Sequence, residues 1–204
     1  MIRKLRQMTS KGSNVPVLLA LLIPLFSAVP MKSSANNAAN SRYIQVLGAI
    51  AAPSGATKLC TTYEWACATT RKSNGLSNRT LKMVGDINKK INGRVRSVSD
   101  QAQYKKREVW ALPTRKGGDC EDFALLKKRE LIALGIDPSR LLLATVFDRR
   151  QGAHAVLVLR TEGGDLILDN LTNKIQPWRA TQYTFMRMQN PQKPTTWVAV
   201  SAGI

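Results

Sequence analysis

Three apolar stretches in the C-terminal half constrain the fold of this 204-residue chain more than any other feature. They cover residues 141–147, 153–160 and 165–169, and the sequences DRRQG and TEGGD separate them. Short apolar runs bounded by Gly, Asp and other turn-forming residues are typical of β-strands joined by tight turns. We therefore expect an antiparallel three-stranded meander in this part of the chain.

Two helices are predicted before the meander. Apolar residues recur every three or four positions within residues 77–92, which favours a helix packed on the core. A second helix begins near Asp119, a good N-cap, and ends near Gly135. On its helical wheel one side carries an apolar stripe that Lys127 interrupts; the stripe consists of Cys120, Phe123, Ala124, Leu131 and Leu134.

Helices followed by a sheet indicate an α+β fold, with the helix that bears Cys120 packed on the antiparallel sheet. The chain is 44% hydrophobic and 22% charged, which suffices for one core. We assign this domain to residues 57–204.

Residues 1–35 have the layout of a secretory signal peptide: basic residues, an apolar run over 15–29, and small residues at the end. The alternative is a membrane anchor, but the run is shorter than the ~20 residues of a spanning helix and contains Pro16 and Pro24. We therefore expect export to the periplasm, with residues 36–56 as a flexible mature N-terminus.

The chain is strongly basic, with a net charge of +18. Removal of residues 1–35 takes away five basic and no acidic residues, which leaves 26 basic against 13 acidic and a net charge of +13. This charge suits an anionic partner. Because the basic clusters are scattered and lack interleaved aromatic residues, we expect a solvated basic surface and no nucleic-acid partner.

Cys60 and Cys67 form a closely spaced pair within KLCTTYEWACATT. In an oxidising compartment a local disulfide is the simplest outcome, whereas a zinc site would need a second pair of ligands at similar spacing. We expect the disulfide, which leaves Cys120 as the odd thiol.

Cys120 follows two glycines and opens the predicted second helix. The backbone N–H groups and the dipole at a helix N-terminus favour a thiolate, so we expect a lowered pKa for this thiol. The structural alternative is a buried, inert cysteine that packs as a small hydrophobe.

The chain contains one histidine, so a His-rich zinc site and a two-His metalloprotease helix are excluded. That residue, His154, starts the middle apolar stretch, and Asp169 ends the next one. Taken alone, each is explained as a surface or turn residue. Together with Cys120 they supply a nucleophile, a base and an orienting carboxylate, the groups that nucleophilic acyl transfer requires.

The spacing of His154 and Asp169 places them on one face of the meander. With a tight turn at residues 163 and 164, Asp169 opposes Val158, four residues or about 13 Å beyond His154. Contact therefore does not follow from this register. A wider or bulged turn that reaches back toward residues 161 and 162 would bring the two side chains together.

Three carboxylates, Asp119, Glu121 and Asp122, lie within one turn of Cys120. Like charges oppose thiolate formation. Helix capping explains one or two of them, and the alternative is a calcium site built from three hard oxygen ligands, which would offset the repulsion.

The sequences GGDCEDFALLKKRELIALG, GAHAVLVLR and LILDNL together resemble the bacterial transglutaminase-like cysteine peptidase family, which includes the LapG-type periplasmic proteases. The resemblance extends over roughly residues 60–200 and includes the two spaced cysteines, INKKINGRVRSVSD and VWALP. It implies a papain-like, transglutaminase-type fold. It also implies a triad with Cys120 as nucleophile, His154 as base and Asp169 as orienting carboxylate.

The resemblance further implies a calcium site formed by the acids that flank the nucleophile, here Asp119, Glu121 and Asp122. The backbone N–H of Cys120 and a side chain near Asn88 or Trp110 are candidate oxyanion donors.

LapG-type members cleave a surface adhesin and are restrained by an inner-membrane receptor, so the resemblance implies an exported or surface protein substrate and such a receptor as partners. Two other functions stay open: acyl transfer to an amine by the same triad, as in a transglutaminase or amidase, and a basic periplasmic binding module without catalysis.

Overall fold

A computed structural model describes residues 42–69 and 75–201. The predicted signal peptide and residues 36–41 lie outside the described residues. Within the described ranges, no helix combines the length and apolar character needed to cross a bilayer.

The described strands form a seven-stranded antiparallel sheet in the order β1-β7-β6-β2-β3-β4-β5. The strands are β1 (Val46–Ile50), β2 (Leu141–Phe147), β3 (Ala153–Thr161), β4 (Gly164–Leu168), β5 (Gln176–Pro177), β6 (Thr184–Gln189) and β7 (Trp197–Val200). Strands β2, β3 and β4 are neighbours joined by short turns, so the predicted meander is confirmed.

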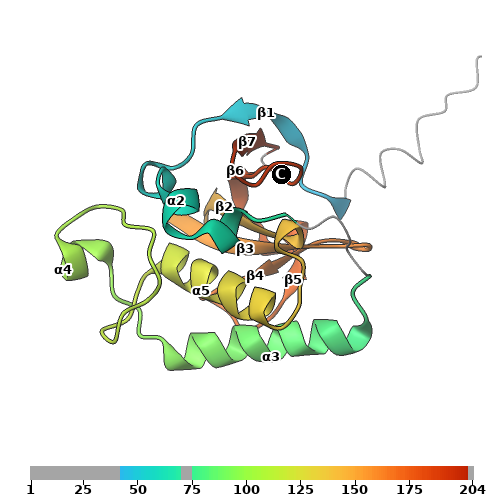
Figure 1. Ribbon diagram of the computed structural model, residues 1–204, viewed down its shortest axis with the longest axis horizontal. Coiled ribbons are helices and arrows are strands. Elements are labelled where there is room, and N and C mark those ends of the chain that lie inside the picture. Colours follow the sequence, from blue (N-terminus) through green and yellow to red (C-terminus); the bar gives the residue numbers. More distant parts are fainter. Residues whose placement is uncertain (1–41, 70–74, 202–204) are drawn as a thin grey trace, which may run out of the picture. The chain divides into compact units, whose positions relative to one another are not determined.

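The described helices are α2 (Leu59–Thr62), α3 (Asn78–Arg94), α4 (Asp100–Tyr104) and α5 (Cys120–Ala133), with short 3-10 turns η1 (Ser54–Ala56), η2 (Glu64–Cys67), η3 (Pro138–Arg140) and η4 (Trp178–Thr181). Both predicted long helices are present as α3 and α5. Ser77 caps α3 by accepting a hydrogen bond from the Thr80 backbone N–H at 3.1 Å. Figure 1 shows α5 between α3 and strand β3 of the sheet.

This placement explains an error in the predicted stripe of α5. Leu134 is half exposed, whereas Lys127 and Lys128 are completely buried. A helix covered by another helix on one side and by a sheet on the other has no wide solvent face, so an amphipathic pattern does not describe it. Helix α5 therefore carries charged side chains into the interior.

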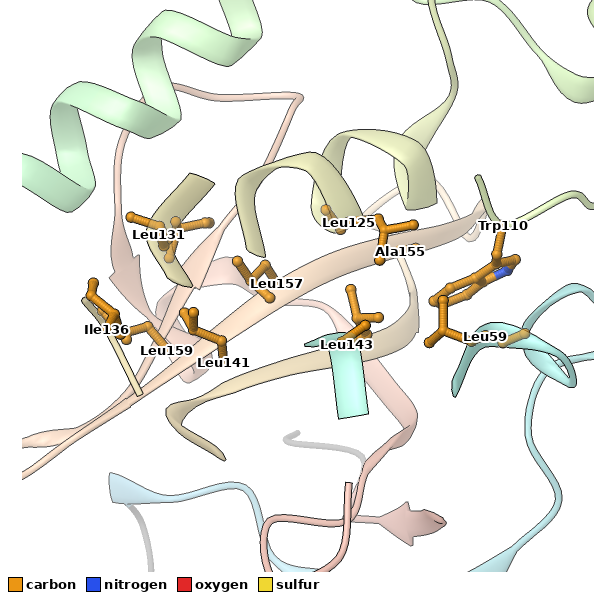
Figure 2. Close-up of a cluster of buried hydrophobic side chains, with 14 of the residues drawn as sticks. Leu59, Trp110, Leu125, Leu131, Ile136, Leu141, Leu143, Ala155, Leu157 and Leu159 are labelled. Carbon is orange, nitrogen blue, oxygen red and sulfur yellow. The ribbon is translucent and has the colours of Figure 1, made fainter. Parts of the chain in front are cut away.

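Each face of the sheet has its own hydrophobic core, because successive residues of a strand point to opposite faces. In β2, Leu141 and Leu143 belong to the cluster beneath α5, whereas Leu142 and Val146 belong to the second cluster. Figure 2 shows Leu125 and Leu131 of α5 above residues of β2 and β3 in the first cluster. The first cluster holds the helix that bears Cys120 against the sheet.

The prediction of a flexible N-terminus over residues 36–56 is wrong for the part that the structure describes. Residues 46–50 form β1, which pairs with β7 at the edge of the sheet, and Ile44 is buried in the second cluster. The partner strand lies about 150 residues later in the sequence, so no local pattern marks this pairing.

Candidate active site

Cys120 is the first residue of α5, and a constrained approach places it there. Gly117 adopts φ 125°, and a Cβ built on it would lie 2.1 Å from the Arg96 carbonyl oxygen. Asp119 occupies the predicted N-cap position, but its side chain does not cap the helix. Its Oδ2 instead accepts a hydrogen bond from the Asp100 backbone N–H at 3.1 Å.

Cys60 and Cys67 are joined in a disulfide that links α2 to η2, as predicted, with a Cα–Cα distance of 5.5 Å. Cys120 is the free thiol of the chain and is partly buried. It lines a pocket of 460 Å³ whose wall also contains Glu121, Trp110 and His154. The structure therefore places the predicted nucleophile and the predicted base on one pocket.

His154 and Asp169 are in direct contact: His154 Nε2 lies 2.9 Å from Asp169 Oδ1, and both side chains are buried. The register explains how. The turn falls on residues 162 and 163, one position earlier than the predicted turn, so Thr161 pairs with Gly164 and Leu157 with Leu168. Asp169, the residue after β4, is therefore offset from His154 by two residues along the neighbouring strand instead of four. The two side chains bridge this offset.

Asp169 has a third partner that the sequence did not reveal. Its Oδ1 also accepts from the Leu171 backbone N–H at 2.9 Å, and its Oδ2 accepts from the Tyr183 hydroxyl at 2.5 Å. Burial raises the pKa of Asp169, but the hydrogen bonds and the charge of His154 outweigh it, so the pKa lies below its usual range. Tyr183 lies within the stretch of family resemblance, at the start of YTFMRMQNPQKPTTWVAV, but no motif marked it as a functional residue.

The environment of the Cys120 thiol differs from the predicted one. Burial, followed by the charge of the adjacent Glu121, raises the pKa of the thiol, so the expected lowering by the helix N-terminus is wrong for this structure. The thiol donates a hydrogen bond to Glu121 Oε2 at 3.1 Å. In this state Cys120 is a protonated thiol held by the neighbouring carboxylate.

Three carboxylates gather next to the nucleophile: one oxygen each of Asp100, Asp119 and Glu121 lies within 4.8 Å of the others. Burial, then the charge of Asp119, raises the pKa of Glu121, and burial raises that of Asp100. Among the described residues, Asp119 Oδ1 is buried and has no hydrogen-bond partner. Clustered hard oxygen donors with an unpartnered buried oxygen fit a divalent cation such as calcium.

The cluster contains one carboxylate that was not in the predicted ligand set, and it lacks one carboxylate that was. The additional member is Asp100, at the start of α4. It was not predicted because it lies 19 residues before Asp119 in the sequence. Asp122 is not in the group: it is completely buried, and its Oδ1 accepts from the Ala111 backbone N–H at 3.0 Å. Its pKa is raised to about 7, chiefly by burial. Asp122 therefore holds the loop before α5 against the helix.

Of the two side chains considered as oxyanion donors, Trp110 lines the pocket and Asn88 does not. Trp110 lines the pocket beside Cys120 and packs edge-on against Trp197. The Asn88 amide instead donates to the carbonyl oxygens of Thr172 and Asn173, away from the pocket lining. Asn88 is thus a structural residue of α3, and its candidacy as an oxyanion donor is wrong.

Known proteins that are similar to this chain include solved structures and a family represented by a sequence model. No curated protein matches the chain. Among solved structures, calcium-bound LapG of Legionella pneumophila is 28% identical, with a TM-score of 0.49 and coverage of 56% of this chain and 68% of that chain. EGTA-treated LapG of the same organism is 27% identical, with a TM-score of 0.48 and coverage of 56% and 66%.

A family model described as bacterial transglutaminase-like cysteine proteinase matches residues 46–203, which is most of the chain and nearly all of the described part. The match begins at β1 and ends after β7, so it spans the whole sheet as well as both long helices. The chain therefore belongs to the bacterial transglutaminase-like cysteine proteinase family, with the transglutaminase-like α+β fold, and is a cysteine peptidase.

Proposed function

We propose that this protein is a periplasmic cysteine endopeptidase that cleaves an exported or surface protein with a triad of Cys120, His154 and Asp169. One observation carries the proposal: His154, which contacts the buried Asp169 at 2.9 Å, lies on the wall of the pocket that also contains the free thiol of Cys120. A thiol, an imidazole and a carboxylate in this order suit nucleophilic acyl transfer.

The contacts of His154 assign different roles to its two imidazole nitrogens. Nε2 of His154 is held by Asp169, so Nδ1 is the nitrogen that accepts the thiol proton. Sγ then attacks the peptide carbonyl, a C–S bond forms, and the C–N bond breaks as His154 protonates the leaving amine. Water hydrolyses the thioester, and its proton returns through His154 to the thiol.

The backbone N–H of Cys120 is the proposed oxyanion donor, since it lies at the open start of α5, where N–H groups lack partners within the helix. Trp110 shapes the pocket wall beside it.

We include calcium in the proposal, bound by Asp100, Asp119 and Glu121. The three-carboxylate cluster and the unpartnered Asp119 Oδ1 support it, and the residues flanking the nucleophile were expected to bind calcium from the family resemblance. When bound, the cation supplies positive charge beside Cys120, which offsets the repulsion between Glu121 and a thiolate.

The compartment, the substrate and the regulator are proposed on the sequence. The signal-like residues 1–35 support export, and the Cys60–Cys67 disulfide suits an oxidising compartment. The family resemblance suggests a surface adhesin as substrate and an inner-membrane receptor as regulator.

The triad is tested by comparing surface and periplasmic proteins from cells that express the parent, Cys120→Ala or Asp169→Asn. We expect one protein to stay full length with Cys120→Ala and to be shortened far more slowly with Asp169→Asn. Asp86→Asn is the matched control, because Asp86 is exposed on α3, and it should behave as the parent. Normal processing by Cys120→Ala would refute the peptidase mechanism, and product analysis with an added amine separates hydrolysis from amine transfer.

The calcium site is tested by the melting temperature of the purified protein in calcium and in EGTA. A ligand at 100 times its Kd stabilises a protein by about 2.7 kcal/mol, so the parent should melt at a higher temperature in calcium. Asp100→Asn should lose this shift, whereas the control Asp86→Asn should keep it. If the parent melts at the same temperature in both buffers, or Asp100→Asn keeps the full shift, these carboxylates do not bind calcium.

A further inference from the structure

We propose that Tyr183 is a positioning residue of this triad: its hydroxyl and its ring hold Asp169 and His154 so that the imidazole directs Nδ1 toward the thiol. The proposal rests on the proposed function, since it assigns Tyr183 a part in the same Cys120, His154 and Asp169 mechanism. It adds a fourth side chain, from a segment that neither the triad motifs nor the acidic cluster includes.

The backbone fixes where Tyr183 lies. It sits between η4 and β6, and its N–H donates to Thr181 Oγ1 at 3.2 Å. The Thr181 hydroxyl in turn donates to the Trp178 carbonyl at 2.6 Å, and the intervening Gln182 has φ 59°. Tyr183 as a residue is 7% exposed, and it packs in the second hydrophobic cluster. Its position is therefore set by the fold and does not require a ligand.

The hydroxyl of Tyr183 completes the restraint of the Asp169 carboxylate. Oδ1 accepts from His154 and from the Leu171 backbone N–H, both at 2.9 Å, and Oδ2 accepts from Tyr183 at 2.5 Å. The terminal torsion of an Asp side chain is soft, so donors on one oxygen alone leave the carboxylate free to tilt. Tyr183 is the side chain that restrains the second oxygen.

The ring of Tyr183 also contacts the imidazole. The two ring centroids are 5.8 Å apart with an interplanar angle of 87°, an edge-to-face arrangement. This contact limits rotation of the imidazole about its bond to Cβ. One residue thus touches both His154 and Asp169, and each contact favours the same imidazole orientation.

Protonation states agree with these roles. Burial, then the hydrogen bond to Asp169, raises the pKa of Tyr183 above its usual value, so the hydroxyl stays a donor. Asp169 is ionised and can only accept, so a singly protonated imidazole at His154 carries its proton on Nε2. Nδ1 is then the acceptor that the Cys120 thiol requires.

Tyr183→Phe removes the hydroxyl and keeps the packed ring. Tyr43→Phe is the matched control, because the Tyr43 hydroxyl donates to the carbonyls of Thr161 and Glu162 at the far end of β3. Each variant loses one tyrosine hydroxyl that donates a hydrogen bond within the domain, but only Tyr183→Phe loses the hydrogen bond to Asp169. Melting temperatures establish that both variants are folded.

The first readout is the tautomer of His154. Because the chain has one histidine, protein made without a histidine tag and with ¹⁵N-labelled histidine gives signals from that imidazole alone. We expect the proton on Nε2 in the parent and in Tyr43→Phe, and a mixture of tautomers in Tyr183→Phe. A purely structural role of Tyr183 would change stability without changing the tautomer.

The second readout is the rate at which iodoacetamide alkylates Cys120, the free thiol of the chain, in calcium-containing buffer. Hydrogen bonds to charged groups are stronger than neutral ones, so we expect about a ten-fold lower rate constant in Tyr183→Phe and no change in Tyr43→Phe. Asp169→Asn should also lower the rate. Adding Tyr183→Phe to Asp169→Asn should have no further effect, because the hydroxyl acts through that carboxylate.

The outcomes separate this proposal from the proposed function. If Asp169→Asn leaves the alkylation rate unchanged, the triad itself fails. If Asp169→Asn slows alkylation but Tyr183→Phe matches Tyr43→Phe in rate and tautomer, the triad stands and the role of Tyr183 is refuted. If Tyr183→Phe does not fold, the parent spectrum decides, since a proton on Nδ1 instead of Nε2 overturns the assigned orientation.

Discussion

Lys128 of α5 offers a quantitative test of how the interior of this domain is built. Its side chain is completely buried, and Nζ donates to Gln189 Oε1 at 2.8 Å. Burial lowers the pKa of Lys128 from 10.5 to about 7. Methionine has a similar length and no charge, so Lys128→Met removes the titrating group while it fills most of the same space.

The sign of the effect follows from proton linkage. Between pH 7 and 10.5 the unfolded chain binds a proton on Lys128 that the folded chain does not, so this group's contribution to stability rises with pH. Relative to a lysine with unchanged pKa, the group costs about 4 kcal/mol at pH 7 and about 2 kcal/mol at pH 9. Loss of the hydrogen bond to Gln189 costs about 1 kcal/mol at either pH. Lys128→Met should therefore be more stable than the parent by about 3 kcal/mol at pH 7 and about 1 kcal/mol at pH 9.

Urea unfolding followed by tryptophan fluorescence measures both values, because the chain has four tryptophans. Lys82→Met is the control: Lys82 pairs with Asp86 on the exposed side of α3, and its stability difference should not change with pH. The reasoning fails if Lys128→Met gains the same stability at pH 7 and pH 9, or if Lys82→Met shows the same dependence on pH.

Two further variants, a double cysteine replacement and a glycine replacement, test the structure around the site. Replacing Cys60 and Cys67 by Ala removes a disulfide between residues seven positions apart. We expect the free energy of unfolding, measured in urea, to fall by about 2–3 kcal/mol. Equal stability of the variant and the parent would contradict a stabilising role of the disulfide. Gly118→Ala should lower the melting temperature by an amount equivalent to about 1–3 kcal/mol, because its Cβ would lie 2.5 Å from Asp122 Oδ2. The control Gly85→Ala, in open space within α3, should raise it, and similar effects of both would rule out the steric argument.

Local patterns in the sequence were sufficient for most of the scaffold. The three- and four-residue spacing of apolar residues predicted α3, and turn residues between apolar stretches predicted β2, β3 and β4. These signals are contained within segments of 20 residues or fewer, where propensity and hydrophobic period act together. Candidate catalytic residues followed because the chain holds one histidine and one unpaired cysteine.

Long-range pairing was not accessible in the same way. Strand β1 depends on β7, and the carboxylate cluster depends on a contact between α4 and the start of α5 that brings Asp100 to Asp119. The distance between His154 and Asp169 depended on a turn position that a run of two glycines leaves ambiguous by one residue. In each case the sequence supplied the residue type, and the tertiary structure decided which residues meet.

Helix α5 shows why the failures of pattern reasoning fall near the site. A helix enclosed on two sides should be apolar all round, yet this one buries Glu121, Asp122, Lys127 and Lys128 as well as presenting Cys120. Each buried charge opposes folding unless a partner compensates it. Asp122 and Lys128 have hydrogen-bond partners in the Ala111 N–H and the Gln189 side chain, which offset part of this cost and fasten α5 to neighbouring segments. Among the described residues, Glu121 contacts the thiol and lies near two further carboxylates, so its burial opposes folding, and the cation that we propose for this site would offset that cost.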